Sequence, residues 1–184
     1  MRLGLSLHPD SRCAAVAGIE VEITRLHANR LALLYAVTGD IGAVQLAPRA
    51  AAIRADELWR HTCFESFIRA ESGEDYYELN FAPSTEWAAY HFTSCRAGMR
   101  VADEISALDI LPSPGAGAFE LRVTLALDQM IWLQQAARWR LALSAVIEET
   151  NGEKSYWALA HAPGKPDFHN AAAFAYDMPA PERP

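Results

Sequence analysis

The stretch Leu58–Phe92 constrains the fold more than any other part of the chain, because it predicts three consecutive β-strands. It holds half of the chain's phenylalanine, tyrosine and tryptophan residues. Side chains alternate between two faces along Thr62–Ala70, Tyr76–Phe81 and Glu86–Phe92, and short runs of turn-forming residues separate these segments. The stretch therefore predicts an antiparallel meander with aromatic side chains on both faces.

Two carboxylates, Glu65 and Glu78, stand in the middle of the first two predicted strands. A mid-strand carboxylate needs a polar partner or water, so one face of this sheet is not expected to be an ordinary apolar core. The simplest assignment gives the core the apolar side chains Phe64, Ile68, Tyr77, Leu79 and Phe81.

Short alternating segments recur through the rest of the chain. Phe119–Leu127, Arg138–Glu148 and Lys154–His161 are the clearest, and Asn151-Gly152 between the last two is a hairpin turn. About nine to eleven strands are expected. This spacing predicts an all-β fold, an antiparallel, jelly-roll-like β-sandwich.

One short helix is expected at Leu127–Ala137, with Asp128 as its N-cap. Met130 and Trp132 are placed like core residues of this helix. The segment after Ala162 is rich in proline and is expected to be mostly irregular. The chain of 184 residues predicts a single domain over 1–178, followed by a proline-rich tail over 179–184.

The charge and composition exclude several classes of protein. A net charge of −7 argues against nucleic acid as a partner, because phosphate binding requires a basic surface. The three cysteines are widely spaced and predict free thiols of a reducing compartment. No signal peptide or membrane-spanning apolar run is visible, so a cytoplasmic location is the default, or a periplasmic or secreted one if a leader had been removed.

Aromatic rings next to carboxylates and amides indicate carbohydrate binding, because rings cover the C–H faces of a sugar while polar groups bind its hydroxyls. A core position is the alternative for each tryptophan. The aromatic candidates are Trp59, Tyr76, Trp87 and Trp157. The polar candidates are Glu65, Glu78, Asn80 and Arg122.

Three other chemistries stay open. Glu65 and Glu78 on neighbouring strands could act as the paired carboxylates of a glycosidase. His61, Cys63 and Glu65 alternate as a possible zinc trio, although no second ligand pair follows, and calcium could bind near Glu71–Asp75.

Haem is a further alternative, for which the internal methionines Met99 and Met130 would be axial candidates, but no CxxCH motif is present.

His161 and His169 flank a rigid loop at 163–167 and could serve as a base or a sugar contact. Surface or capping roles are the alternative for both histidines.

The motifs LWRHTCFESFI and YYELNFAPSTEWAAYHF together resemble the pattern of DOMON-like domains similar to family 9 carbohydrate-binding modules. The match covers about 35 residues, and SYWALAHAPGKPDFHN is more loosely similar to the C-terminal strand and loop of that family. The resemblance implies a β-sandwich with a shallow ligand site built from aromatic and polar residues.

In the sugar-binding members of this family, two tryptophans clamp a sugar ring and a strand glutamate binds it. The resemblance places Trp59 at the first clamp and Glu65 at the glutamate, with Trp157 as the candidate for the second clamp. Glu78 stands where those members carry an arginine. Haem-binding members use a methionine and a histidine, a pair that the sequence does not place.

The sequence thus predicts a non-catalytic domain that binds a small ligand, with carbohydrate as the favoured ligand and no bound metal. The alternatives are a glycoside hydrolase that uses Glu65 and Glu78, and a haem-binding domain. If the two carboxylates share a face, a cation such as Arg122 or a metal must lie between them, or one must be protonated. The predicted ligand-binding residues are Trp59, Glu65, Glu78, Asn80, Arg122 and Trp157.

Overall fold

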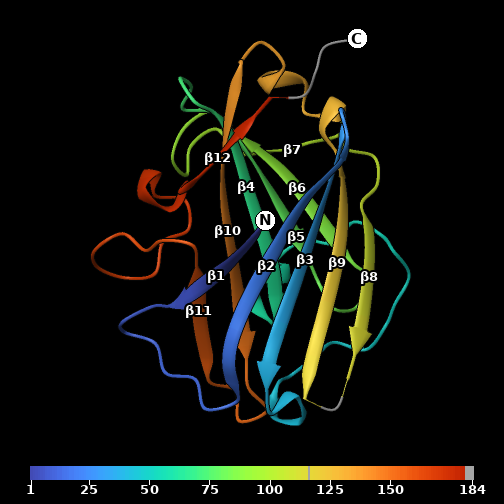
Figure 1. Cartoon of the computed structure of the whole chain (residues 1–184), viewed down its shortest axis with the longest axis vertical. Helices are drawn as coiled ribbons and strands as arrows, with labels where there is room; N and C mark the ends of the chain where they lie inside the picture. The colour runs from blue at the N-terminus through green and yellow to red at the C-terminus, as the bar shows by residue number, and fades with distance from the viewer. Residues whose placement is uncertain (116, 181–184) are drawn as a thin grey trace.

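The computed structural model describes residues 1–115 and 117–180 as a curled antiparallel β-sheet structure (Figure 1). Eleven strands follow one continuous hydrogen-bonded path, and β12 pairs with β10 off this path. The strands are β1 (Arg2–Leu7), β2 (Val16–His27), β3 (Arg30–Gly39), β4 (Cys63–Ala70), β5 (Tyr76–Phe81), β6 (Trp87–Phe92), β7 (Arg100–Val101), β8 (Asp109–Pro114), β9 (Ala118–Ala126), β10 (Arg138–Glu148), β11 (Lys154–Ala158) and β12 (Tyr176–Pro179). The 3-10 helices are η1 (Ile41–Ala43), η2 (Leu58–Arg60), η3 (Leu127–Gln129), η4 (Ile131–Leu133) and η5 (Ala171–Ala173).

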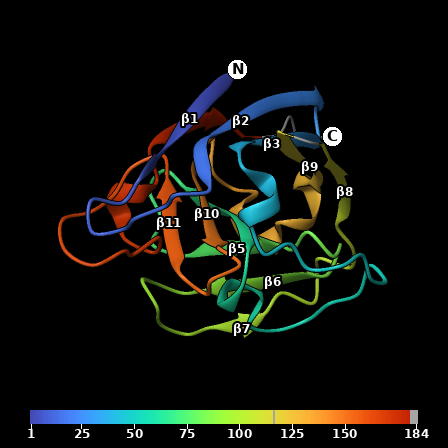
Figure 2. The same ribbon diagram turned by 90° about the horizontal axis from the view of Figure 1, so that it is seen from below.

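The sheet folds into two layers (Figure 2). One layer has the order β1-β2-β3-β9-β8, and the other has the order β7-β6-β5-β4-β10-β11. Strand β1 joins the layers, because Leu3 pairs with Val21 of β2 while Leu7 pairs with Trp157 of β11. This arrangement confirms the predicted all-β antiparallel sandwich.

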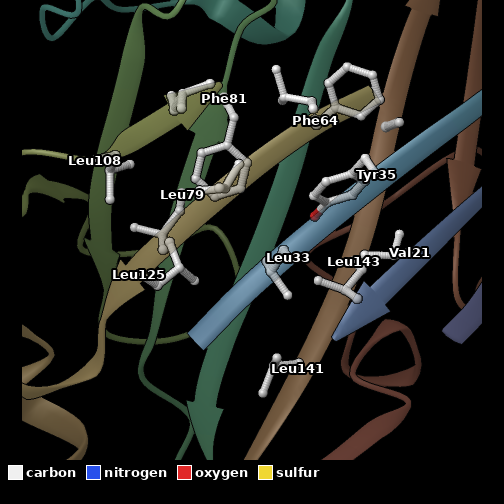
Figure 3. Packing of buried hydrophobic residues seen from close by; sticks show 14 of the residues in the cluster. Val21, Leu33, Tyr35, Phe64, Leu79, Phe81, Leu108, Leu125, Leu141 and Leu143 are labelled. Carbon is white, nitrogen blue, oxygen red and sulfur yellow. The ribbon is translucent and has the colours of Figure 1, made fainter. Parts of the chain in front are cut away.

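The main core fills the space between the two layers (Figure 3). Leu33 and Tyr35 project from β3 toward Leu79 of β5 and Leu143 of β10, and all four side chains are buried. The Tyr35 hydroxyl donates a hydrogen bond of 2.8 Å to the backbone oxygen of Glu65 in the facing layer. The five residues predicted as core, which are Phe64, Ile68, Tyr77, Leu79 and Phe81, all belong to this cluster.

The predicted helix at Leu127–Ala137 is wrong, because the segment forms the two short helices η3 and η4. Its buried residues Leu127, Met130 and Leu133 recur every three positions, which matches the three residues per turn of a 3-10 helix. Asp128 makes no side-chain cap. Met130 is a core residue as expected, but Trp132 is not, since 56% of it is exposed.

The C-terminal segment has more structure than its proline content predicts. The helix η5 is capped by the Asn170 side chain, which accepts from the backbone N–H of Ala172 at 3.0 Å. Strand β12 pairs with β10 as far as Pro179, opposite Arg138. The rest of the predicted tail, 181–184, lies outside the described residues.

No helix in residues 1–115 and 117–180 is long and apolar enough to cross a membrane. The three cysteines, Cys13, Cys63 and Cys95, are free thiols.

Candidate functional site

A second apolar cluster covers the outer face of the layer that contains β4, β5 and β6. Every residue of β5 and β6 is buried, so this layer is covered on both faces. The outer-face cluster consists of Phe67, Tyr76, Ala88, Tyr90, Phe92, Ala142, Ala173 and Phe174, with Leu58 and Phe168 packed against it. The segments around η2 and η5 therefore fold over the outside of the sheet and build walls there.

Between these walls lies a cavity of about 850 Å³, which we call the outer-face cavity. Its residues come from β4, β5, β6, β10 and β11, from η2 and the two residues before it, and from the segments 93–101 and 159–170. They are Asp56, Glu57, Trp59, Arg60, Glu65, Glu78, Tyr90, Phe92, Arg96, Met99, Val101, Val146, Lys154, Tyr156, Pro166, Phe168 and His169.

Glu65 and Glu78 lie on adjacent strands on the same face, because Glu65 pairs with Asn80 and Glu78 pairs with Phe67. Only 3% of Glu65 and 6% of Glu78 are exposed. Glu65 Oε2 accepts a hydrogen bond of 3.3 Å from Ser144 Oγ on β10, and Glu78 Oε1 accepts one of 2.8 Å from Asn80 Nδ2. Both carboxyl groups therefore line the cavity from the sheet.

Burial of these two carboxyl groups raises both of their pKa values. For Glu65, loss of solvation raises the pKa well above its ordinary value, and the neighbouring Glu78 charge raises it further. For Glu78, loss of solvation also raises the pKa, although the hydrogen bond from Asn80 and the charge of Arg96 oppose the shift. Two like charges that repel one another on adjacent strands favour a shared proton, and protonation of one carboxyl group was one of the alternatives expected from the sequence.

His169 lies over Glu78, with its Nε2 atom 3.7 Å from Glu78 Oε2. Its Nδ1 atom is 2.7 Å from the Tyr76 hydroxyl, which also accepts from the backbone N–H of Arg96 at 3.2 Å. The hydroxyl hydrogen is then directed to Nδ1, which assigns the ring proton to Nε2, on the side of Glu78. Burial lowers the pKa of His169 to about 4, so its ring is neutral near neutral pH.

The segment that carries His169 is held by Asp167. Asp167 Oδ1 accepts from Arg96 Nη2 at 2.8 Å and from the His169 backbone N–H at 3.2 Å. Arg96 adopts a positive φ of 56°, and Glu57, which directly precedes η2, adopts one of 60°. These are two of only three such non-glycine residues in the described chain, and both line the cavity, where backbone strain often accompanies a binding site.

Trp59 stands at the rim of the cavity on η2, and 47% of it is exposed. The guanidinium of Arg60 lies 5.4 Å from its ring centre. On the floor, the Tyr90 hydroxyl donates to Asp56 Oδ1 at 2.6 Å, which ties the strand to the segment that leads into η2. The rim thus offers an accessible flat ring above a floor of buried polar groups.

Three of the six predicted ligand-binding residues do not line the cavity. Trp157 belongs to the core between the layers, where its Nε1 donates to Ser155 Oγ at 3.0 Å. Arg122 is exposed on β9 in the other layer, between Leu34 and Leu111 of the neighbouring strands, so it does not lie between the two glutamates. Asn80 is fully buried and supports Glu78.

Several residues of the cavity were not predicted from the sequence. Tyr156 precedes Trp157 on β11 and therefore faces the opposite side of the sheet, into the cavity. Arg96, Phe168 and His169 come from connecting segments, whose positions no alternation predicts. Tyr90 and Phe92 alternate with His91 on β6, so their shared face was visible in the sequence although not its role.

Within the described residues, no group of three or more histidine, cysteine or acidic side chains is placed to hold a metal ion. His61 instead faces Glu148, with Nδ1 2.7 Å from Oε2. Met99 and His169 both line the cavity, but Nδ1 of His169 contacts Tyr76 and Nε2 faces Glu78. Neither ring nitrogen is directed toward open space, so this pair does not fit haem ligation.

Comparisons with known proteins identify the fold. No protein-family model matches the sequence, and no curated protein matches it either. A solved structure from Bacteroides uniformis, of a protein only provisionally assigned to carbohydrate binding, is similar with a TM-score of 0.71 at 13% identity, over 98% of this chain and 86% of that one.

A family 9 carbohydrate-binding module from Caldicellulosiruptor kristjanssonii is also similar. In complex with cellotriose it gives a TM-score of 0.61 at 8% identity, over 98% of this chain and 83% of that one. In complex with glucose it gives a TM-score of 0.57 at 8% identity, over 95% and 81%. The predicted resemblance to family 9 carbohydrate-binding modules is therefore confirmed at the level of the fold.

Proposed function

We propose that this chain is a non-catalytic domain that binds a saccharide in the outer-face cavity. The observation that carries the proposal is the position of Trp59 at the rim of the same cavity into which the buried Glu65 and Glu78 project. The fold supports it, because the similar structures include modules in complex with cellotriose and glucose.

Recognition combines ring contacts with hydrogen bonds. The Trp59 and Tyr156 rings provide apolar surfaces for the C–H faces of a sugar, while Glu65 and Glu78 accept hydrogen bonds from its hydroxyls. Because both carboxyl groups are almost fully removed from water, a ligand without hydroxyls would leave them unpaired. Such unpaired groups discriminate strongly against the wrong ligand.

Titration with mono- and disaccharides, followed by tryptophan fluorescence and calorimetry, tests the proposal. We expect Trp59→Ala to weaken binding about tenfold or more, since it removes a ring surface from the site. Trp132→Ala is the matched control, because Trp132 is similarly exposed but lies outside the cavity lining, and it should leave affinity unchanged. No response to any saccharide by protein shown to be folded would overturn the proposal.

Glycoside hydrolysis is the second candidate. It is favoured by one observation, that Glu65 and Glu78 form a closely interacting pair whose pKa values are both raised, as a general acid requires. A panel of aryl glycosides tests it: turnover that Glu65→Gln abolishes while binding persists would support an enzyme. Absence of turnover across the panel would leave the binding domain.

A further inference from the structure

The floor of the outer-face cavity carries two acidic side chains that form no ion pair with a lysine or arginine of the described residues. At the rim, Arg60 Nη2 pairs with Glu57 Oε1 at 2.7 Å, and Arg96 pairs with Asp167 at 2.8 Å. These pairs satisfy the two rim guanidinium groups locally. Lys154 is exposed at the start of β11. The charge of Arg96 acts on both Glu65 and Glu78 and opposes the rise in their pKa values, but in the described residues no lysine or arginine of the cavity forms an ion pair with either of them.

Glu65 and Glu78 have no cationic contact in the described part of the chain. Among the described residues, the basic side chain in contact with one of them is His169, 3.7 Å from Glu78, and its ring is neutral near neutral pH. Glu65 Oε1 accepts no hydrogen bond from any described residue, although only 3% of the residue is exposed and it lines the cavity. Two carboxyl groups thus face the cavity, with Oε1 of Glu65 open as an acceptor and with no ion pair to a lysine or arginine among the described residues.

From this arrangement we propose that the saccharide of this site carries a protonated amino group, which binds between Glu65 and Glu78. The ligand class is an amino sugar with a free amine, so the inference rests on the proposed saccharide function and specifies it further. An ammonium group supplies three N–H donors and the positive charge that the floor lacks. Charge-assisted hydrogen bonds to buried carboxylates are stronger than those from neutral hydroxyls.

The aromatic side chains of the floor suit the same ligand. Phe92 and Tyr90 line the cavity on β6, next to Glu78 on β5. Phe92 is held in place by stacking on Tyr76, with ring centres 4.9 Å apart and planes 6° apart. Aromatic faces attract cations, and desolvation strengthens that attraction. Buried carboxylates together with aromatic rings are therefore a better environment for an ammonium group than for an anionic sugar.

Binding of an ammonium group should release a proton. Without ligand, mutual repulsion favours a proton shared between Glu65 and Glu78, whereas a bound cation favours both carboxylates ionised. One proton then leaves to solvent for each cation bound, so affinity rises with pH as long as the amine stays protonated. The other charged or titratable groups around the floor are Tyr35, Asp56, Glu57, Arg60, Cys63, Tyr76, Tyr90, Arg96, Lys154, Tyr156, Asp167 and His169.

Calorimetric titration with matched triplets of sugars tests the inference. Each triplet is a hexose, the corresponding 2-amino-2-deoxyhexose and its N-acetylated form, in the gluco, galacto and manno configurations. In at least one triplet we expect the free amine to bind about tenfold tighter than both neutral forms, equivalent to about 1.4 kcal/mol. Titrations in buffers of different ionisation enthalpy should show proton release for the amine and none for the hexose.

Variants locate the effect. Glu65→Gln and Glu78→Gln should each reduce the preference for the amine to less than about threefold and abolish proton release. Glu120→Gln, an exposed substitution on β9, is the control and should change neither. Thermal unfolding confirms that each variant is folded.

The outcomes separate this inference from the function on which it rests. If a neutral hexose binds as tightly as its amine, the inference is overturned and the saccharide-binding function stands. If the amine is preferred but Glu65→Gln and Glu78→Gln retain the preference, the inference is also overturned. If no sugar of any triplet binds, both proposals fail.

Discussion

The fold holds the Glu65 side chain in place, although ionisation of this buried carboxyl group lowers the stability of the folded state. Its neighbours supply one hydrogen bond from Ser144, but no cation in the described chain contacts it. Burial and the nearby Glu78 raise its pKa, so the folded state holds a proton on Glu65 more tightly than the unfolded state does. Stability then falls as pH rises from the ordinary carboxyl pKa toward the raised one.

We predict that Glu65→Gln stabilises the protein increasingly with pH. The amide keeps an acceptor for Ser144 but carries no charge, so the variant avoids the cost of ionising a buried group. At about pH 4 the two proteins should differ little, whereas at about pH 8 the variant should be more stable by about 1 to 3 kcal/mol. Urea unfolding followed by tryptophan fluorescence at both pH values measures the difference.

Glu120→Gln serves as the control for this prediction, because Glu120 is exposed on β9. Its effect on the free energy of unfolding should stay within about 0.5 kcal/mol at both pH values. A Glu65→Gln variant that is less stable than the parent at about pH 8 would contradict the prediction, since it would mean that the ionised carboxylate is stabilised in the fold.

Single residues also show where prediction from the sequence stops. Trp59, Glu65 and Glu78 were predicted for the site, and all three line the cavity. Trp157 was predicted as a ligand contact, whereas its neighbour Tyr156 lines the cavity. Because side chains on a strand alternate between its two faces, the Trp157 ring lies on the opposite side of the sheet. Arg122 was expected beside Glu78, but which layer a strand joins is decided by long-range pairing.

At the scale of an element, the end of β3 requires a glycine. Gly39 has a φ of +140°, and a side chain there would meet the backbone atoms of Ala15, Val16 and Ala17. The backbone N–H of Gly39 donates to the backbone oxygen of Gly117, and the backbone N–H of Asp40 donates to that of Ala15. The turn into η1 is therefore built around the absence of a Cβ atom.

We predict that Gly39→Ala lowers the free energy of unfolding by about 2 to 4 kcal/mol, because the backbone contacts cannot yield without shifting β2. Gly4→Ala in β1 is the matched control. A Cβ atom added to Gly4 would have no heavy atom within 4 Å, and Gly4 has no positive φ, so its replacement should be neutral or slightly stabilising. Chemical denaturation measures the free energy of unfolding of each variant. Equal effects of the two substitutions would contradict the prediction.

Secondary-structure elements were predicted correctly where the local sequence pattern determines them. The three strands of Leu58–Phe92 occur within one residue of their expected starts, as β4, β5 and β6, because alternation and turn residues agree there. The segment after β9 was predicted as one helix but forms two 3-10 helices. The spacing of three residues between Leu127, Met130 and Leu133 fits a 3-10 helix and also resembles one face of an α-helix. Such short segments take their conformation from the core they cover.

At the scale of the whole molecule, strand order could not be read from the sequence. Strand β10 lies between β4 and β11, although about seventy residues separate β4 from β10. The outer-face cavity depends on this order, since it brings Ser144 of β10 and Tyr156 of β11 next to the meander. Sequence alternation gives each strand two faces but does not say which strands are neighbours.

Strand β1 has a special place in this order, because it is the link between the two layers. Arg2–Leu5 pair with β2, and Ser6 and Leu7 pair with β11. Leu5 also contributes to the main core. Without β1, both β2 and β11 would present an unpaired edge, and exposed edges promote pairing with other chains.

We therefore predict that deleting residues 1–7 lowers the melting temperature by about 10 °C or more and causes self-association relative to the full chain. Differential scanning calorimetry and light scattering after size-exclusion chromatography measure the two effects. Arg2→Gln is the control: it removes only the exposed contacts of Arg2 with Glu20 and Glu22 and should change stability by less than about 1 kcal/mol. A truncated chain with unchanged melting temperature and oligomeric state would show that β2 and β11 tolerate open edges, and that the two layers are held together by the core alone.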